Sequence, residues 1–135
     1  MKCILDTNIL ISASLFPGSV PAKAYFKAIT LPNTAVVCDY SIDELHKVYN
    51  RKFRDKLSTL ESFLMQLLRT VKIIETPPEE EAVENEMYIR DLNDRPILRA
   101  ACRSDVDILV TGDKDFLSSG ITHPHIVSPA DFLRI

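Results

Sequence analysis

The sequence lacks a Cys-x-x-Cys pair, an excess of positive charge and any long apolar run. Its three cysteines, Cys3, Cys38 and Cys102, lie in apolar stretches, so we expect buried, reduced thiols and a reducing compartment. The formal net charge of −3 gives no overall basic signature for nucleic acid, although it leaves room for a local basic patch.

Signals for membranes and export are also missing. No apolar run approaches the about 20 residues that a membrane-spanning helix needs. Asp6 and Asn8 interrupt the first apolar stretch and leave only Ile9–Phe16, which is a poor match to the apolar region of a secretory signal. We therefore expect a soluble, cytoplasmic protein.

The composition is that of an ordinary globular domain. The chain has 135 residues, of which 46% are hydrophobic and 26% charged, enough for a real core. Repeats, linkers and low-complexity segments are absent from the sequence. We expect one domain over residues 1–135.

Short apolar segments alternate with amphipathic ones along the chain. We expect strands at residues 2–6, 34–39, 71–76, 106–113 and 125–128. Helices are expected at 8–15, 21–30, 39 or 41 to 51, 55–70, 79–90 and 93–104, with a last turn from 129. This alternation implies βαβ crossovers. We predict an α/β fold of three layers, in which a mainly parallel sheet of four to five strands has helices on both faces.

Carboxylates stand at the ends of two predicted strands. Asp6 follows the first strand and Asp113 ends the fourth, and sites in open α/β sheets form at the C-terminal ends of strands. The two acids converge if these strands are neighbours. Asp94 begins the helix before the fourth strand, where the helix dipole favours its ionised form. Glu44 lies one turn into the helix after the second strand. The glutamates at 79–84 are expected on a solvated helix face.

Each acid has a plain structural explanation by itself: Asp94 as a helix cap, Asp113 as a turn residue and Glu44 as a helix surface residue. As a set they repel one another unless something pairs with them. An ionised Asp6 between apolar neighbours is costly to bury alone. A hard cation bound by carboxylate oxygens would stabilise the whole set.

Four segments, LDTNIL, SIDELHKV, DLNDRPILRAA and LVTGDKDF, occur in the order and approximate spacing of the PIN domain. The resemblance covers nearly the whole chain and is nearest to the VapC-like branch, described as toxin components of toxin–antitoxin systems. The resemblance implies that the four acids of the family fall on Asp6, Glu44, Asp94 and Asp113.

Some positions within this resemblance have alternatives. Asp91 competes with Asp94 as the third acid, although the phase relative to PILRAA favours Asp94. Asp43 competes with Glu44 for the inward-facing position. The resemblance also suggests auxiliary residues: Asn8 and Thr111, similar to polar residues that orient the carboxylates, and Asp115 as a further acid.

The resemblance implies an endoribonuclease that depends on Mg²⁺ or Mn²⁺, with the metal bound by Asp6, Asp94 and Asp113. Glu44 would hold a water on the ion, or a second ion. The implied partners are RNA, single-stranded or structured, a cognate antitoxin protein and further copies of the chain in a homodimer or higher homo-oligomer. No membrane partner is implied.

Basic residues gather near and beyond the end of the third predicted helix: Lys47, Arg51, Lys52, Arg54 and Lys56. The first three are the candidate RNA contacts and are called the basic cluster below. It is either a solvated helix end or a set of contacts to RNA phosphates. His123 and His125, in THPHIV, are expected to be surface residues rather than metal ligands.

Other classes of protein fit less well. A receiver-like domain needs an Asp after the third strand, where this chain has IIETPP. A haloacid-dehalogenase-type phosphatase needs Asp-x-Asp after the first strand, where this chain has Asp-Thr-Asn. A catalytically inactive PIN-fold module that binds RNA or a protein partner stays open, and the complete set of acids disfavours it.

Overall fold

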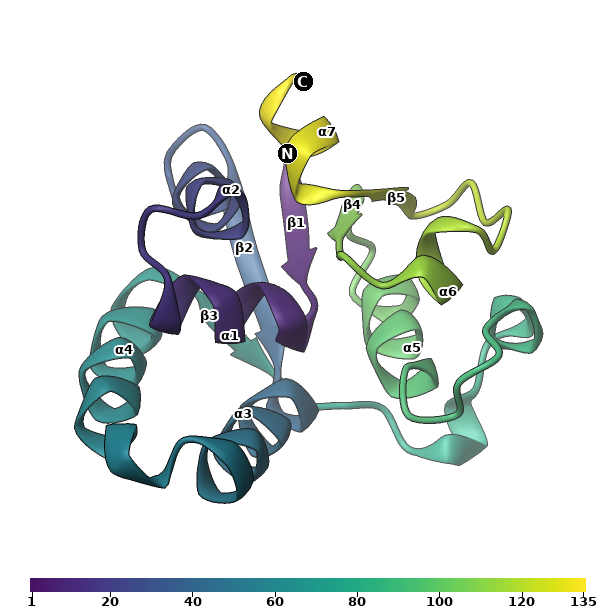
Figure 1. Cartoon of the computed structure of the whole chain (residues 1–135). Helices are drawn as coiled ribbons and strands as arrows, with labels where there is room; N and C mark the ends of the chain where they lie inside the picture. The colour runs from purple at the N-terminus through teal and green to yellow at the C-terminus, as the bar shows by residue number, and fades with distance from the viewer.

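A computed structural model describes residues 1–135 and shows one five-stranded sheet with helices on both faces (Figure 1). All strand pairs are parallel, in the order β3-β2-β1-β4-β5. The strands are β1 (Lys2–Leu5), β2 (Thr34–Cys38), β3 (Lys72–Ile74), β4 (Ile108–Val110) and β5 (His125–Val127). The predicted three-layer α/β fold is confirmed.

Side-chain caps begin several of the helices. Ser19 accepts a hydrogen bond from the backbone N–H of Ala22, and Ser128 accepts one from Asp131, which satisfies donors that the first turn leaves free. The helices are α1 (Thr7–Leu15), α2 (Val20–Ala28), α3 (Asp39–Lys52), α4 (Leu57–Thr70), α5 (Arg95–Arg103), α6 (Lys114–Leu117) and α7 (Pro129–Leu133). Three short 3₁₀ turns are η1 (Arg54–Lys56), η2 (Glu79–Glu81) and η3 (Glu84–Tyr88). None of the helices combines the length and apolar character needed to cross a bilayer.

Alternate side chains of each strand enter two separate cores. In β1, Cys3 and Leu5 belong to a core of 20 buried residues under α1, α2, α3, α4 and α7. Ile4 belongs to a core of 11 buried residues under α5 and α6 on the other face. Figure 1 shows α4 on the left of the molecule and α5 and α6 on the right, with the strands between them. Both faces of the central strand are therefore buried, and its C-terminal end is fixed in place.

The fourth strand is shorter than expected and does not reach Asp113. Its regular pairing ends at Val110, and the backbone N–H of Thr111 makes one more hydrogen bond, to the carbonyl of Val127. The chain then turns through Gly112, and Asp113 becomes the N-cap of α6. Asp113 therefore lies beyond the strand end rather than in it.

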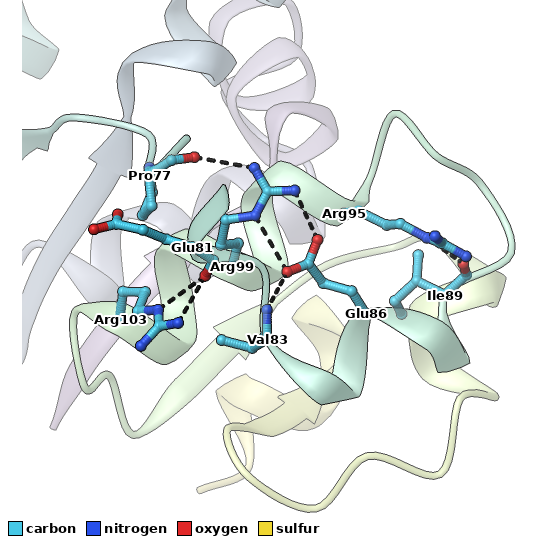
Figure 2. A network of polar contacts seen from close by, with 8 residues as sticks. All are labelled: Pro77, Glu81, Val83, Glu86, Ile89, Arg95, Arg99 and Arg103. Atoms are coloured by element: carbon cyan, nitrogen blue, oxygen red, sulfur yellow. Dashed lines mark hydrogen bonds and ion pairs between the residues drawn. The ribbon is translucent and has the colours of Figure 1, made fainter. Parts of the chain in front are cut away.

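The helix expected over residues 79–90 is wrong, because this segment forms η2 and η3 instead. Glu79, Glu80, Glu81 and Glu84 are exposed, as expected, but Glu86 is buried. The side chain of Glu86 pairs with Arg99 of α5 at 2.7 Å, and Arg99 also donates to the carbonyl of Pro77 (Figure 2). These contacts with α5 replace the intrahelical hydrogen bonds that a helix would have formed.

Two more arginines of α5 hold the same segment. Arg103 donates to the carbonyl of Glu81, and Arg95 donates to the carbonyl of Ile89 (Figure 2). The three arginines are spaced four residues apart and so lie along one face of the helix. The segment before Asp94 is therefore fixed against α5 at several points.

Candidate functional site

Asp6 is buried at the C-terminal end of the central strand. Because β1 pairs with β4, the ends of these strands meet, and Thr111 lies beside Asp6. Oδ2 of Asp6 accepts a 2.6 Å hydrogen bond from the Thr111 hydroxyl, and Oδ1 accepts a 2.7 Å bond from the backbone N–H of Thr7. Burial raises the pKa of Asp6 to about 6, and these two hydrogen bonds oppose the rise. Protein donors are thus the direct partners of Asp6.

Thr111 also connects Asp6 to the next acid. Its side chain is fully buried, and its oxygen accepts a 3.0 Å hydrogen bond from the backbone N–H of Asp113. Oδ1 of Asp113 in turn accepts a 2.9 Å bond from the backbone N–H of Asp115. This chain of hydrogen bonds fixes three acids relative to one another.

Asp94, Asp113 and Asp115 form a compact acidic cluster. One carboxylate oxygen of each lies within 4.8 Å of those of the other two. Oδ2 of Asp94 is the one buried side-chain oxygen or nitrogen without a hydrogen-bond partner. Burial and the Asp113 carboxyl raise the pKa of Asp94 to about 8, with a further contribution from Asp6.

The helix dipole, which was expected to favour the ionised form, therefore does not dominate the pKa of Asp94. Its side chain makes no capping hydrogen bond to α5, and its neighbours are carboxylates. Burial and like charge outweigh the partial positive charge of a helix end, which contributes about 1 kcal/mol or less at exposed sites.

The acidic cluster fits a hard divalent cation. Its donors are carboxylate oxygens, the ligands that Mg²⁺ and Mn²⁺ prefer. The two ion pairs of the structure, Glu86 with Arg99 and Asp131 with Arg134, involve none of its members. The unpartnered oxygen of Asp94 is the atom that a bound cation would satisfy. Asp6 is close enough to influence Asp94 but lies outside the three-residue cluster.

Glu44, rather than Asp43, turns toward the site. Glu44 is half-buried, whereas Asp43 is exposed. Oε1 of Glu44 accepts a 2.7 Å hydrogen bond from the hydroxyl of Thr7. Burial raises the pKa of Glu44, and the Thr7 hydrogen bond and the charge of Lys47 oppose the rise.

Thr7 was not expected from the sequence, and Asn8 does not take the orienting role. Asn8 is exposed, and its side chain makes no hydrogen bond. The first helix begins at Thr7 rather than at residue 8, so the inward-facing polar side chain is one position earlier. The Asp6-Thr7 pair in the sequence could have revealed this helix start, because a helix whose N-cap is an Asp begins at the next residue.

Asp91 and Tyr40 lie near the acidic cluster. Asp91 is exposed, and its Oδ1 accepts a 2.9 Å hydrogen bond from the backbone N–H of Asn93, so it belongs to the turn before α5. Tyr40, one turn before Glu44 on α3, is half-buried. Burial and the charges of Glu44, Asp94 and Asp91 raise the pKa of Tyr40 to about 12.

The basic cluster of Lys47, Arg51 and Lys52 is exposed on α3. Arg51 and Lys52 lie in the last turn of this helix, and Lys47 lies one turn beyond Glu44. At about 1.5 Å per residue, the eight positions from Glu44 to Lys52 cover about 12 Å. The cluster thus extends along the helix from the edge of the acidic site.

A family model described as the PIN domain matches residues 2–115. The chain belongs to the PIN domain family. The match includes every acid of the candidate site, from Asp6 to Asp115. No curated protein sequence gives a significant match.

Solved structures share the fold of this PIN domain. The structure of VapBC2 from Rickettsia felis, bound to a DNA fragment from their promoter, contains a chain that matches with a TM-score of 0.68 and 18% identity, covering 95% of this chain and 98% of that one. PAE2754 from Pyrobaculum aerophilum gives 0.70 and 19%, covering 99% and 88%. VapC20 from Mycobacterium tuberculosis, a sarcin–ricin loop cleaving toxin, gives 0.63 and 12%, covering 89% and 96%.

Proposed function

We propose that this PIN domain is an endoribonuclease dependent on Mg²⁺ or Mn²⁺ and the toxin of a toxin–antitoxin pair. The supporting observation is the buried Oδ2 of Asp94, which lacks a hydrogen-bond partner while its carboxylate lies with Asp113 and Asp115. Membership of the PIN family, and the likeness in fold to a toxin that cleaves the sarcin–ricin loop, support the choice of RNA as substrate.

The residues of the site take distinct tasks in this proposal. Asp94 and Asp113 hold the cation, together with Asp6 and with Asp115 as a further ligand. A bound divalent cation supplies stabilisation of negative charge on the phosphate and lowers the pKa of a water molecule. Oε2 of Glu44 accepts no protein hydrogen bond, so it is free to orient a water and accept its proton.

The polar residues keep these acids in place. Thr111 holds Asp6 and the backbone of Asp113 together, and Thr7 holds Asp6 and Glu44. A bound cation would activate a water molecule, so the proposal requires no His, Ser or Cys nucleophile.

We also propose a cytoplasmic setting, a DNA-binding antitoxin partner and self-association as a homodimer or higher homo-oligomer. The likeness in fold to a chain of VapBC2, which was solved with promoter DNA, supports the antitoxin. The exposed basic cluster on α3 supports contacts with the RNA backbone.

The test is cleavage of single-stranded RNA by the purified protein in Mn²⁺, in Mg²⁺ and in EDTA. We expect cleavage only with metal, and a loss on the order of 10²-fold or more in Asp94→Asn, since a catalytic ion supplies several kcal/mol. Asp43→Asn is the matched control, because Asp43 is an exposed acid beside Glu44. Undiminished cleavage in EDTA contradicts the proposal. RNA binding without cleavage in any metal favours the inactive binding module instead.

A further inference from the structure

A polar pocket of about 360 Å³ lies between η3 and the loop that follows α6. Asn85 and Tyr88 line it from the η3 side, and Ser119, Thr122 and His123 line it from the loop. The Asn85 side-chain amide donates a 3.3 Å hydrogen bond to the carbonyl of His123, which joins the two walls. None of the residues described so far as part of the acidic cluster lines this pocket.

Both walls continue into the segments that carry the acids. From the η3 wall the chain continues through buried Ile89 to Asp94. From Asp115 it continues through the last residues of the short α6 to the loop wall. Arg95 and Arg99 fix the first of these segments to α5 (Figure 2). The pocket is therefore held in a constant position relative to the acidic cluster.

The lining chemistry matches an uncharged, planar ligand with polar edges. The lining residues include no Asp, Glu, Lys or Arg. The side chains of Tyr88, Thr122 and His123 make no hydrogen bond within the protein, so their donors and acceptors are available. Tyr88 is 56% exposed and stacks on no other ring of the chain. RNA-binding proteins use such aromatic side chains as stacking platforms for unpaired bases.

Two basic residues lie near the pocket's walls along the chain. Arg90 follows Tyr88 by two residues, and Lys114 opens α6 between Asp113 and Asp115. Both side chains are exposed and neither forms an ion pair. Exposed basic side chains of this kind are available to contact an RNA backbone.

We propose that this pocket binds one unpaired base of an RNA chain, stacked on Tyr88. The identification of the ligand as RNA rests on the proposed ribonuclease function. The pocket selects single-stranded segments, because a base inside a duplex has no exposed face to stack on the tyrosine.

The test measures binding rather than cleavage. The probe is a fluorescein-labelled single-stranded RNA homopolymer of about ten nucleotides, added in EDTA and followed by fluorescence anisotropy. We expect Tyr88→Ala to weaken binding about fivefold or more, because stacking on an aromatic side chain contributes about 1–3 kcal/mol per base. Tyr88→Phe keeps the ring and is expected to bind as the wild type does.

Two controls separate stacking from general effects. Phe16→Ala removes another exposed aromatic residue, 60% exposed at the end of α1, and is expected to leave binding unchanged. An abasic ribose-phosphate chain of the same length is expected to bind wild type and Tyr88→Ala equally. Equal RNA affinity of wild type and Tyr88→Ala, or a loss that the abasic chain reproduces, overturns the inference. RNA binding that depends on Tyr88 without any cleavage in metal overturns only the nuclease proposal.

Discussion

The hydroxyl of Thr7 donates a 2.7 Å hydrogen bond to Oε1 of Glu44, which lies 37 residues further along the chain. The backbone N–H of Thr7 donates another, also of 2.7 Å, to Oδ1 of Asp6. One threonine thus fixes the relative positions of two acids that belong to different elements, the end of β1 and the first half of α3.

Replacing Thr7 with valine keeps the shape of the side chain and removes the hydroxyl. We expect kcat for RNA cleavage to fall about 10- to 100-fold, the usual cost of losing a residue that orients a metal-site ligand. KM is expected to stay nearly constant, because Thr7 contacts acids and not RNA. Thr7→Ser is expected to restore kcat, and steady-state kinetics in Mn²⁺ measure both variants. A valine variant with wild-type kcat would show that Glu44 needs no positioning.

Metal binding is expected to stabilise the folded protein, since the unfolded chain has no cluster of Asp94, Asp113 and Asp115. At a hundredfold excess over Kd the gain is about 2.7 kcal/mol. Asp94→Asn should lose most of this gain, and in EDTA it should melt no lower than wild type, because it removes a buried carboxylate beside Asp113. Thermal melts in EDTA and in Mn²⁺ measure both effects, with exposed Asp43→Asn as the control. Identical wild-type melts at saturating metal contradict cation binding here.

The basic cluster on α3 is expected to contact RNA phosphates. For Arg51→Ala combined with Lys52→Ala, we expect weaker RNA binding and a log–log salt slope lower by roughly 0.7 for each lost contact. Arg69→Ala combined with Lys72→Ala is the matched control. Both residues are exposed. Lys72 is the first residue of β3, at the N-terminal end of this strand, whereas Asp6 follows the C-terminal end of β1. An equal change of the salt slope in the two double variants would mean that RNA binding depends on total charge and not on charges at defined positions.

The buried pair of Glu86 and Arg99 predicts a pH-dependent stability. Burial raises the pKa of Glu86, but hydrogen bonds from Arg99 and the N–H of Val83, with the charge of Arg99, bring it below its ordinary value of 4.5. The stabilisation is therefore complete above about pH 4.5 and is lost as pH falls through the lower pKa of the folded state. Glu86→Gln is expected to cost about 3 kcal/mol at neutral pH, because it leaves Arg99 without its buried counter-ion.

Urea unfolding of wild type and Glu86→Gln, from neutral to acidic pH, measures this dependence. The difference in unfolding free energy is expected to shrink as the pH falls below the ordinary glutamate pKa of 4.5. Glu84→Gln serves as the control, because Glu84 is exposed in the same turn and should change stability little. A difference that stays constant into strong acid would show that the Arg99 pair does not lower the pKa of Glu86.

The sequence was sufficient for most of the fold because local patterns and the tertiary structure agree there. Apolar strands such as β1 and β4 alternate with helices along the chain. Capping residues such as Ser19 and Ser128 mark where some of these helices begin. The segment 79–90 was predicted as a helix because local composition cannot reveal that Glu86 leaves the surface to meet Arg99. That contact joins residues 13 positions apart and forms only when α5 packs.

The resemblance singled out Glu44 and Asp94, and the closeness of Asp6 and Asp113 was predictable because strand ends in a parallel sheet converge. The finer geometry of these acids was not predictable, because it depends on the exact residue at which each helix, strand or turn begins and ends. The start of α1 at Thr7 rather than at residue 8 decides which side chain reaches Glu44. The turn after Val110 brings Asp115 within 4.8 Å of Asp94 and Asp113, which no spacing rule for the segment TGDKD would give.

The central position of β1 has a consequence for protein synthesis. Asp6 is translated 105 residues before its partner Thr111, and the Thr111 backbone is itself held by Val127. At about 5–20 residues per second, roughly 5–20 seconds of translation separate the first acid from the last. The acids of the candidate site therefore come together only after the codon for Asp115 has been translated.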